Sequence, residues 1–246
     1  YLLLGRRLLE LTVLGREGSF LGPEAACSSY VLSDSGSSLL VDHGPGTFAK
    51  LIAQPNYEQL CGVFISHRHD DHWADLSLLS TQRKSEGREP LALLAPQELL
   101  GQLEPEVLRA FAPVAIRVSE DQRLGPFLLN SRRTVHGPET YATRILGPRG
   151  ARFAYSADTG PNFDAPDWAQ ACTLLCEASY SQVREGELEH LSGREAGDLA
   201  NRLGVSRLWL THAQPGEDRV VIEAEAKERF LGPVSTLVAG GRYAIA

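Results

Sequence analysis

The 246 residues of this chain are enough for one large α/β domain or two small ones, and no low-complexity linker divides them. Hydrophobic residues make up 43 % of the chain and charged residues 22 %, which excludes intrinsic disorder and is typical of a globular protein. The formal net charge of −7 argues against a broad basic surface for long nucleic acids. No apolar stretch reaches the roughly 18 residues that a membrane span needs, so we expect no membrane association.

Short apolar runs, typical of buried strands, alternate with stretches of helical spacing in the first half of the chain. The predicted strands are 8–14, 29–32, 39–41 and 61–66. The predicted helices are 47–53, 74–84, 97–103 and 106–111, and Pro96 and Pro105 stand at the starts of the last two.

The second half of the chain continues this alternation. Its predicted strands are 127–129, 141–146, 152–155, 173–176, 208–210 and 235–238, and its predicted helices are 194–203 and 220–230. The chain thus begins with strands, and two stretches of alternating strands and helices follow. This order predicts an α/β protein in which two sheets pack face to face with helices outside.

The cysteines give information on the redox compartment. Cys27, Cys61, Cys172 and Cys176 are too few and too widely spaced for a disulfide scaffold. We interpret them as reduced residues, which predicts a cytoplasmic protein.

The strongest local signal is the segment His67-Arg-His69-Asp-Asp71-His72, which directly follows an apolar strand. A solvated polar loop is the alternative, but three of the seven histidines fall within these six residues. Imidazole and carboxylate groups are ligands that suit zinc. In an extended segment His67 and His69 point to the same side, because side chains alternate along the backbone.

This spacing is the HxHxDH motif, and the chain resembles the metallo-β-lactamase superfamily. Val135-His136-Gly-Pro resembles the third histidine element of that family, Tyr155-Ser-Ala-Asp158-Thr-Gly the bridging aspartate element, and Leu210-Thr-His212 the last histidine element. The resemblance covers essentially the whole chain. It implies a single domain over residues 1–246, folded as an αββα sandwich with the site along one edge of two mixed sheets.

The resemblance also implies a ligand set for two Zn²⁺ ions, with Mn²⁺ as an alternative metal. One ion would be held by His67, His69 and His136, and the other by Asp71, His72 and His212, with Asp158 as the bridge. Taken alone, His136 or His212 would be an ordinary hydrogen-bonded histidine. Together, the histidines at family positions favour the ligand interpretation.

Two further segments resemble the ribonuclease Z-like branch of this family. Glu177, in Cys-Glu-Ala-Ser-Tyr, and His190, in Glu-His-Leu-Ser-Gly, match a glutamate and a histidine that assist proton transfer near the scissile phosphate. The alternatives are an exposed His190 beside a helix and a Glu177 that orients a ligand histidine.

Two departures from this branch affect the expected substrate. The tRNA-processing enzymes carry a flexible arm between the third histidine and the bridging aspartate, but residues 137–157 hold only two short strands and a turn. A CxxC zinc site, present in some small phosphodiesterases of the branch, is also absent. We therefore expect a small phosphodiester or nucleotide-like substrate rather than tRNA.

His43 and the early serines are the remaining candidates. Asp42-His43-Gly-Pro-Gly resembles the early loop of the family near the metals. His43 would then contact a metal ligand or lie beside the substrate, and the alternative is an ordinary loop residue. Ser28 and Ser29 have no base beside them in the sequence, so a serine nucleophile has little support.

The sequence thus predicts a binuclear zinc-dependent hydrolase, most simply a phosphodiesterase. Its ions would lower the pKa of a bound water to about 7 and so supply hydroxide, with Asp71 as a possible base and His190, oriented by Glu177, as the acid. Hydrolysis of a lactone, thioester or β-lactam is the alternative reaction on the same fold. A non-catalytic metal-binding module is a different class, and a homodimer is compatible with the sequence.

Overall fold

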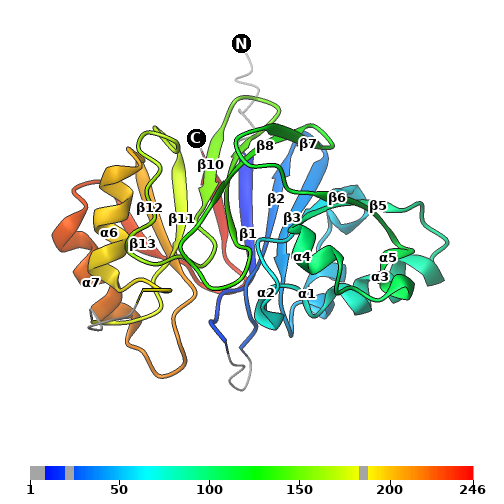
Figure 1. The fold of residues 1–246 in the computed structure, drawn as a ribbon, viewed down its shortest axis with the longest axis horizontal. Helices are drawn as coiled ribbons and strands as arrows, with labels where there is room; N and C mark the ends of the chain where they lie inside the picture. The colour runs from blue at the N-terminus through cyan, green and yellow to red at the C-terminus, as the bar shows by residue number, and fades with distance from the viewer. Residues whose placement is uncertain (1–8, 20–24, 183–187, 246) are drawn as a thin grey trace, which may run out of the picture.

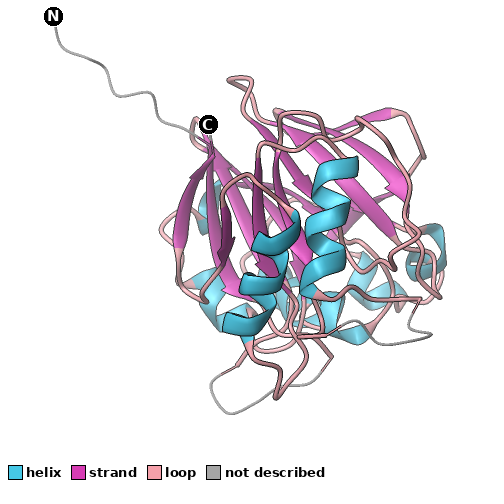
Figure 2. Ribbon diagram, turned by 90° about the vertical axis from the view of Figure 1, so that its left-hand side faces the viewer, coloured by secondary structure: helices cyan, strands magenta, loops and turns pink. Residues whose placement is uncertain are grey.

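In the computed structural model, the described residues are 9–19, 25–182 and 188–245, and they form two seven-stranded sheets packed face to face (Figure 1). Helices lie on the outer sides of both sheets (Figures 1 and 2). This arrangement confirms the predicted αββα sandwich of two mixed sheets. None of the described helices is long and apolar enough to cross a membrane.

The first sheet combines an antiparallel half with a parallel half. Its strands, in spatial order, are β14 (Arg242–Ile245), β1 (Leu9–Gly15), β2 (Ser29–Asp34), β3 (Ser37–His43), β4 (Leu60–Phe64), β5 (Leu91–Ala95) and β6 (Phe111–Ala115). The pairs from β14 to β3 are antiparallel, and those from β3 to β6 are parallel. The strands β3 and β4 therefore end at the same edge of the sheet.

The second sheet has the same mixed character. Its strands, in spatial order, are β13 (Val234–Thr236), β12 (Arg207–Thr211), β11 (Thr173–Glu177), β10 (Arg152–Tyr155), β9 (Tyr141–Leu146), β8 (Phe127–Arg133) and β7 (Asp121–Leu124). The strands β10 to β13 are parallel, whereas β7 to β10 pair antiparallel. As a result β8, β10, β11 and β12 all point the same way.

The helices are divided between the two sheets. Beside the first sheet lie α1 (Phe48–Ile52), η1 (Tyr57–Gln59), α2 (Asp70–Trp73), α3 (Leu76–Ser85), α4 (Gln97–Leu100) and α5 (Pro105–Leu108). Beside the second sheet lie α6 (Gly193–Arg202) and α7 (Arg219–Arg229), which are prominent in Figure 2. The helix α6 begins with a capping box, in which Ser192 and Glu195 satisfy each other's backbone N–H groups.

The central core lies between the inner faces of the sheets, where alternate residues of each strand are buried. The rings of Tyr30 and Tyr155 meet across it at 5.6 Å, and Phe64, Phe127 and Phe153 are also fully buried. Burying an aromatic or aliphatic side chain of this size contributes about 1.5–3 kcal/mol. This core fixes the distance between the two sheets, and with it the distance between the loops at their shared edge.

Some predicted elements need correction. The helix predicted over 106–111 ends at Leu108, because Phe111 pairs with Leu91 as the first residue of β6. Likewise the helix predicted over 97–103 ends at Leu100. The sequence reading missed β5, β6, β7, β14 and the single turn of α2. Leu8, the first residue of the first predicted strand, lies outside the described residues.

Candidate metal centre

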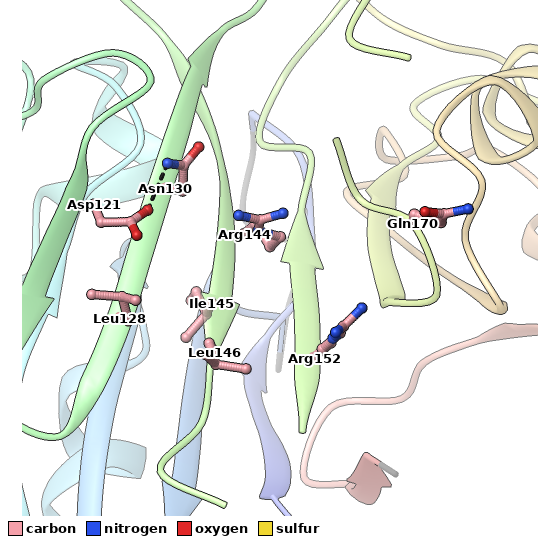
Figure 3. Close-up of a pocket in the computed structure, with 8 residues that line it drawn as sticks. All are labelled: Asp121, Leu128, Asn130, Arg144, Ile145, Leu146, Arg152 and Gln170. Atoms are coloured by element: carbon pink, nitrogen blue, oxygen red, sulfur yellow. Dashed lines mark hydrogen bonds between the residues drawn. The ribbon is translucent and has the colours of Figure 1, made fainter. Parts of the chain in front are cut away.

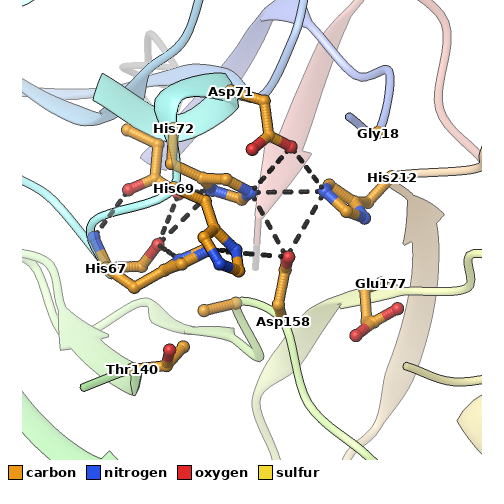
Figure 4. Close-up of polar contacts among 12 residues, drawn as sticks. Gly18, His67, His69, Asp71, His72, Thr140, Asp158, Glu177 and His212 are labelled. Carbon is orange, nitrogen blue, oxygen red and sulfur yellow. Dashed lines mark hydrogen bonds and ion pairs between the residues drawn. The ribbon is translucent and has the colours of Figure 1, made fainter. Parts of the chain in front are cut away.

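All seven predicted ligands follow the carboxyl ends of strands, five of them in loops and two, Asp71 and His72, in the short helix α2. His67, His69, Asp71 and His72 follow β4, His136 follows β8, Asp158 follows β10 and His212 follows β12. Because these strands end at one edge of the sandwich, the loops converge there from both sheets (Figure 4). The structure thus brings together residues that are up to 145 positions apart.

Three histidines and one side of Asp158 form the first group of donors. His69 Nδ1 lies 3.1 Å from His67 Nε2 and 3.1 Å from His136 Nε2. The Oδ2 atom of Asp158 lies 3.6 Å from His67 Nε2 and 3.8 Å from His136 Nε2. The donor atoms of this group all lie within 4.8 Å of one another, which suits a single ion.

The second group lies on the other side of the same aspartate. His72 Nε2 is 3.2 Å from His212 Nε2, and Asp71 Oδ2 is 3.4 Å and 3.3 Å from these two nitrogens (Figure 4). The Oδ1 atom of Asp158 lies 3.3 Å from His72 Nε2 and 3.4 Å from His212 Nε2. Asp158 therefore has one oxygen in each group, which is the geometry of a bridging carboxylate.

The hydrogen bonds behind the imidazoles determine which nitrogen each ring presents. In four rings Nδ1 donates away from the centre: His67 to Ser66 Oγ, His72 to Asp42 Oδ2, His136 to the Glu189 carbonyl and His212 to Ser179 Oγ. Each of these rings then presents the lone pair of Nε2 to its neighbours. Facing lone pairs repel one another unless a cation lies between them.

Asp158 supports the same conclusion. Its Oδ1 atom is buried and has no hydrogen-bond partner among the described residues. Burial alone would raise the pKa of this carboxyl, but His212, His72 and His67 hold the pKa well below its usual value. A buried, ionised carboxylate needs positive charge beside it, which the protonated rings of His72 and His212 supply here and which a bound cation would supply once the rings act as neutral ligands. The donor set therefore fits metal ions, with four Nε2 atoms, His69 Nδ1 and two carboxylates as donors.

Asp42, at the end of β3, organises the base of the second group. Its Oδ2 accepts hydrogen bonds from His72 Nδ1 at 2.7 Å, Tyr155 OH at 2.8 Å and Ser66 Oγ at 2.8 Å, and its Oδ1 accepts from the Ser66 amide at 2.7 Å. The sequence predicts Asp42 in a loop near the expected metals but indicates no role for it. Its position directly after an apolar strand was the available signal.

The backbone at the centre is held in an uncommon conformation. His212, Ala157 and Asp42 have φ values of 61°, 52° and 54°, in the left-handed region that most side chains avoid. Each such residue costs of order 1–3 kcal/mol and persists only where its surroundings enforce it. At His212 the amide donates to the Arg16 carbonyl at 2.9 Å, which helps to hold the turn that directs the ring inward.

Glu177 and His190 lie together beside the two donor groups. His190 Nδ1 is 3.1 Å from Glu177 Oε1 and 4.0 Å from Asp158 Oδ2, and the imidazole stacks on His212 with centroids 5.7 Å apart. Glu177 is buried and accepts hydrogen bonds from the Thr159 amide at 2.6 Å and from Ser179 Oγ at 2.7 Å. Glu177 thus contacts His190 directly and reaches the ligand ring of His212 through Ser179.

His43 is the last residue of β3 and is buried there rather than among the donors. Its Nδ1 lies 2.9 Å from Thr47 Oγ1, and its Nε2 has no hydrogen-bond partner among the described residues. Burial lowers the pKa of His43 from 6.5 to about 3, so the imidazole is neutral. It therefore packs as a neutral ring at the end of β3, next to Thr47.

Comparison with known proteins agrees with this geometry. Residues 37–213 match the family model described as "Beta-lactamase superfamily domain". The chain belongs to the metallo-β-lactamase superfamily. It is 32 % identical over 250 residues to the protein Rv1339 of Mycobacterium tuberculosis, and the match covers 94 % of this chain and 90 % of that protein. It is also 27 % identical over 268 residues to a ribonuclease Z of Agathobacter rectalis, covering 85 % and 88 % of the two chains.

Solved structures of the superfamily show the same fold. The metallo-β-lactamase fold protein YhfI of Bacillus subtilis superposes with a TM-score of 0.85 at 26 % identity, covering 96 % of this chain and 99 % of that one. The short form of human tRNase Z gives a TM-score of 0.74 at 18 % identity over 96 % and 99 % of the chains, and at that identity it shows the fold alone. Superfamily membership and the His/Asp centre together make this chain a metal-dependent hydrolase.

Proposed function

We propose that this chain hydrolyses a small phosphodiester at the His/Asp centre and that His190 protonates the leaving oxygen. The observation that carries the proposal is the position of His190, whose ring stacks on His212 and whose Nδ1 is held by Glu177 and lies 4.0 Å from Asp158 Oδ2. An acid beside the metals suits a leaving group such as an alkoxide, which departs poorly without a proton. The relatives named ribonuclease Z support a phosphodiester as the substrate class.

The ligand residues hold the reacting groups in this proposal. Two divalent cations, Zn²⁺ or Mn²⁺, would be held by the two donor groups and would polarise the phosphoryl group and a water molecule. Asp158 spans both groups and fixes their separation. Asp71 has its pKa held well below the usual value by His72 and His212 although burial opposes this, so it is an ionised carboxylate beside the second position. Its oxygens can orient the attacking water and accept its proton.

Glu177 and His190 would complete the reaction. Because Glu177 is buried and already accepts from Thr159 and Ser179, its carboxylate is fixed in place. It accepts from His190 Nδ1, and a carboxylate in that position stabilises the protonated ring and aims its other nitrogen. Proton transfer from His190 would then use Nε2. Glu177 is a positioning residue in this scheme, and His190 is the group that touches the substrate.

The connection between the third histidine and the bridging aspartate bears on the size of the substrate. After His136 the chain runs into β9 and β10, which are joined by a tight turn closed by the Gly147 amide and the Ala151 carbonyl at 2.9 Å. No arm projects from these described residues to hold a tRNA. We therefore propose a small or cyclic nucleotide-like diester as the substrate.

A substrate panel on the metal-loaded protein tests the proposal. We expect turnover of bis(p-nitrophenyl) phosphate and of small nucleotide diesters, little turnover of lactones, thioesters or β-lactams, and poor processing of precursor tRNA. Asp158→Ala serves as the inactive control, which separates hydrolysis at the centre from contaminating activity. Strong preference for a lactone or thioester would reassign the reaction, and metal-loaded protein with no turnover of any ester would leave a metal-binding module instead.

A further inference from the structure

A second cavity lies on the outward face of the second sheet, away from the metal centre. It has a volume of about 250 Å³ and is lined by residues of β7 to β10, including Arg144 and Arg152 (Figure 3). Leu128 and Arg152 stand near the beginnings of β8 and β10, whereas the metal ligands follow the ends of those strands. The thickness of the sheet and most of the strand length therefore separate the two sites.

The register of the strands places two arginines on either side of a pair of leucines. Across the sheet, Arg123 is opposite Leu128, Leu128 is opposite Leu146, and Leu146 is opposite Arg152. Leu128 is half-buried and Leu146 is exposed, so this row is an apolar strip open to solvent. Side chains opposite one another on a sheet have their Cβ atoms about 4.5–5.5 Å apart, so the strip is continuous.

The next row adds a third arginine. Asp121 is opposite Asn130, Asn130 is opposite Arg144, and Arg144 is opposite Ala154. Asn130 Nδ2 donates to Asp121 Oδ1 at 2.7 Å, as Figure 3 shows. Arg144 and Arg152 are diagonal neighbours on the same face of the sheet, so both guanidinium groups can reach one ligand.

These arginines are not neutralised within the part of the chain that the structure describes. Arg123, Arg144 and Arg152 form no ion pair with a described residue, and Arg144 donates only to the carbonyl of Trp168 at 3.1 Å. Asp121 is the one acidic side chain in the two rows, which leaves them with a net charge of +2. A local surplus of positive charge on a chain of net charge −7 favours an anionic ligand.

We propose that this cavity binds an organic phosphate of two negative charges, of the class of a nucleoside monophosphate. The planar guanidinium groups of Arg144 and Arg152 would hold the phosphate, since arginine binds phosphate oxygens in pairs. Leu128 and Leu146 would lie under the apolar part of the ligand. The volume of about 250 Å³ is just below the range of about 300–1,000 Å³ for small-molecule sites, which suits at most one mononucleotide and not a polymer.

Calorimetric titration of the full metal-loaded chain with AMP tests the site, with inorganic phosphate as a second probe. The variants are the double substitution Arg144→Gln/Arg152→Gln, the single substitution Arg152→Gln and, as a control that matches the charge change of the single substitution, Arg229→Gln, an exposed arginine on α7. We expect AMP to bind the native and Arg229→Gln proteins, and the Kd to rise at least about 100-fold in the double variant, about tenfold for each arginine. Phosphate should bind more weakly than AMP, because it does not reach the leucines.

Several outcomes would overturn the proposal. Equal AMP affinity in the native protein and the double variant would place the ligand at the metal centre, and no binding to the native protein would remove the site. Preference for an acidic peptide over AMP would make the face a protein contact instead. If the double variant does not fold, Arg152→Gln alone decides, because this side chain is exposed and has no hydrogen bond to a described residue. For that variant we expect at least about a tenfold loss.

Discussion

Replacing Asp42 by asparagine should weaken metal binding while the fold is kept. The carboxylate accepts four hydrogen bonds, three on Oδ2 from His72, Tyr155 and Ser66 and one on Oδ1 from the Ser66 amide. An asparagine has one oxygen, so its NH₂ group must face either the His72 Nδ1–H or the Ser66 N–H. Asparagine tolerates the left-handed φ of 54°, so the substitution adds little backbone strain.

The expected loss follows from the bonds that are removed. A hydrogen bond to a charged group contributes about 1.5–3 kcal/mol, and tenfold in affinity corresponds to about 1.4 kcal/mol. In either orientation of the amide, His72 no longer donates to a charged acceptor, so binding of the ion held by Asp71, His72 and His212 should weaken by about 10–100-fold. The other ion should be affected less, because His67 is linked to Asp42 only through Ser66 and His136 rests on the Glu189 carbonyl.

Chelator competition at equilibrium and elemental analysis measure this effect, and denaturant unfolding measures the cost to the fold. Asp34→Asn is the matched control, because Asp34 is also a buried carboxylate but lies at the opposite end of β2 and β3, paired with Arg149. We expect that variant to lose stability without losing metal affinity. If Asp42→Asn binds both ions within twofold of the native protein, its carboxylate only supports the fold and the reasoning is refuted.

Three further predictions test the centre and its surroundings. The native protein should hold close to two metal ions per chain, and Asp158→Ala should weaken the binding of both. Elemental analysis that finds a single ion per chain at saturating metal would contradict the bridging role of Asp158. His190→Ala should keep its metal while kcat falls about 10²–10⁴-fold, and the loss should be smaller for a substrate with a p-nitrophenolate leaving group. Glu177→Gln should lower kcat in the same way but more weakly. Equal losses of kcat on substrates with good and poor leaving groups would count against proton donation. The pKa of His43 falls from 6.5 to about 3 on folding, so below pH 6.5 the unfolded chain takes up a proton that the folded chain does not. The free energy of unfolding should therefore decrease as the pH is lowered below 6.5, by up to about 1.4 kcal/mol per pH unit. Denaturant unfolding of His43→Gln should show a flatter pH dependence between pH 6.5 and 5, and an unchanged slope would assign that dependence to other groups.

The sequence by itself determined the ligand candidates and the type of fold. Imidazole and carboxylate groups at HxHxDH spacing are informative without a structure, because His67 to His72 lie on one short segment and their spacing is set by the local backbone. Most strands with strongly apolar runs were predictable for a similar reason, although β5 was missed. The short edge strands β7 and β14 were not, since β7 alternates charged and buried residues, β14 has a single buried residue, and pairing with a neighbour decides their conformation.

Only the tertiary structure decided what lies behind and around the ligands. Asp42 meets His72 across 30 residues, Tyr155 meets Asp42 across 113, and Ser179 meets His212 across 33. No local pattern encodes such contacts, because they depend on which strands end at the same edge of two packed sheets. The arginines of the outer face likewise became a candidate site only through strand register, which places distant residues opposite one another and is invisible in the order of the chain.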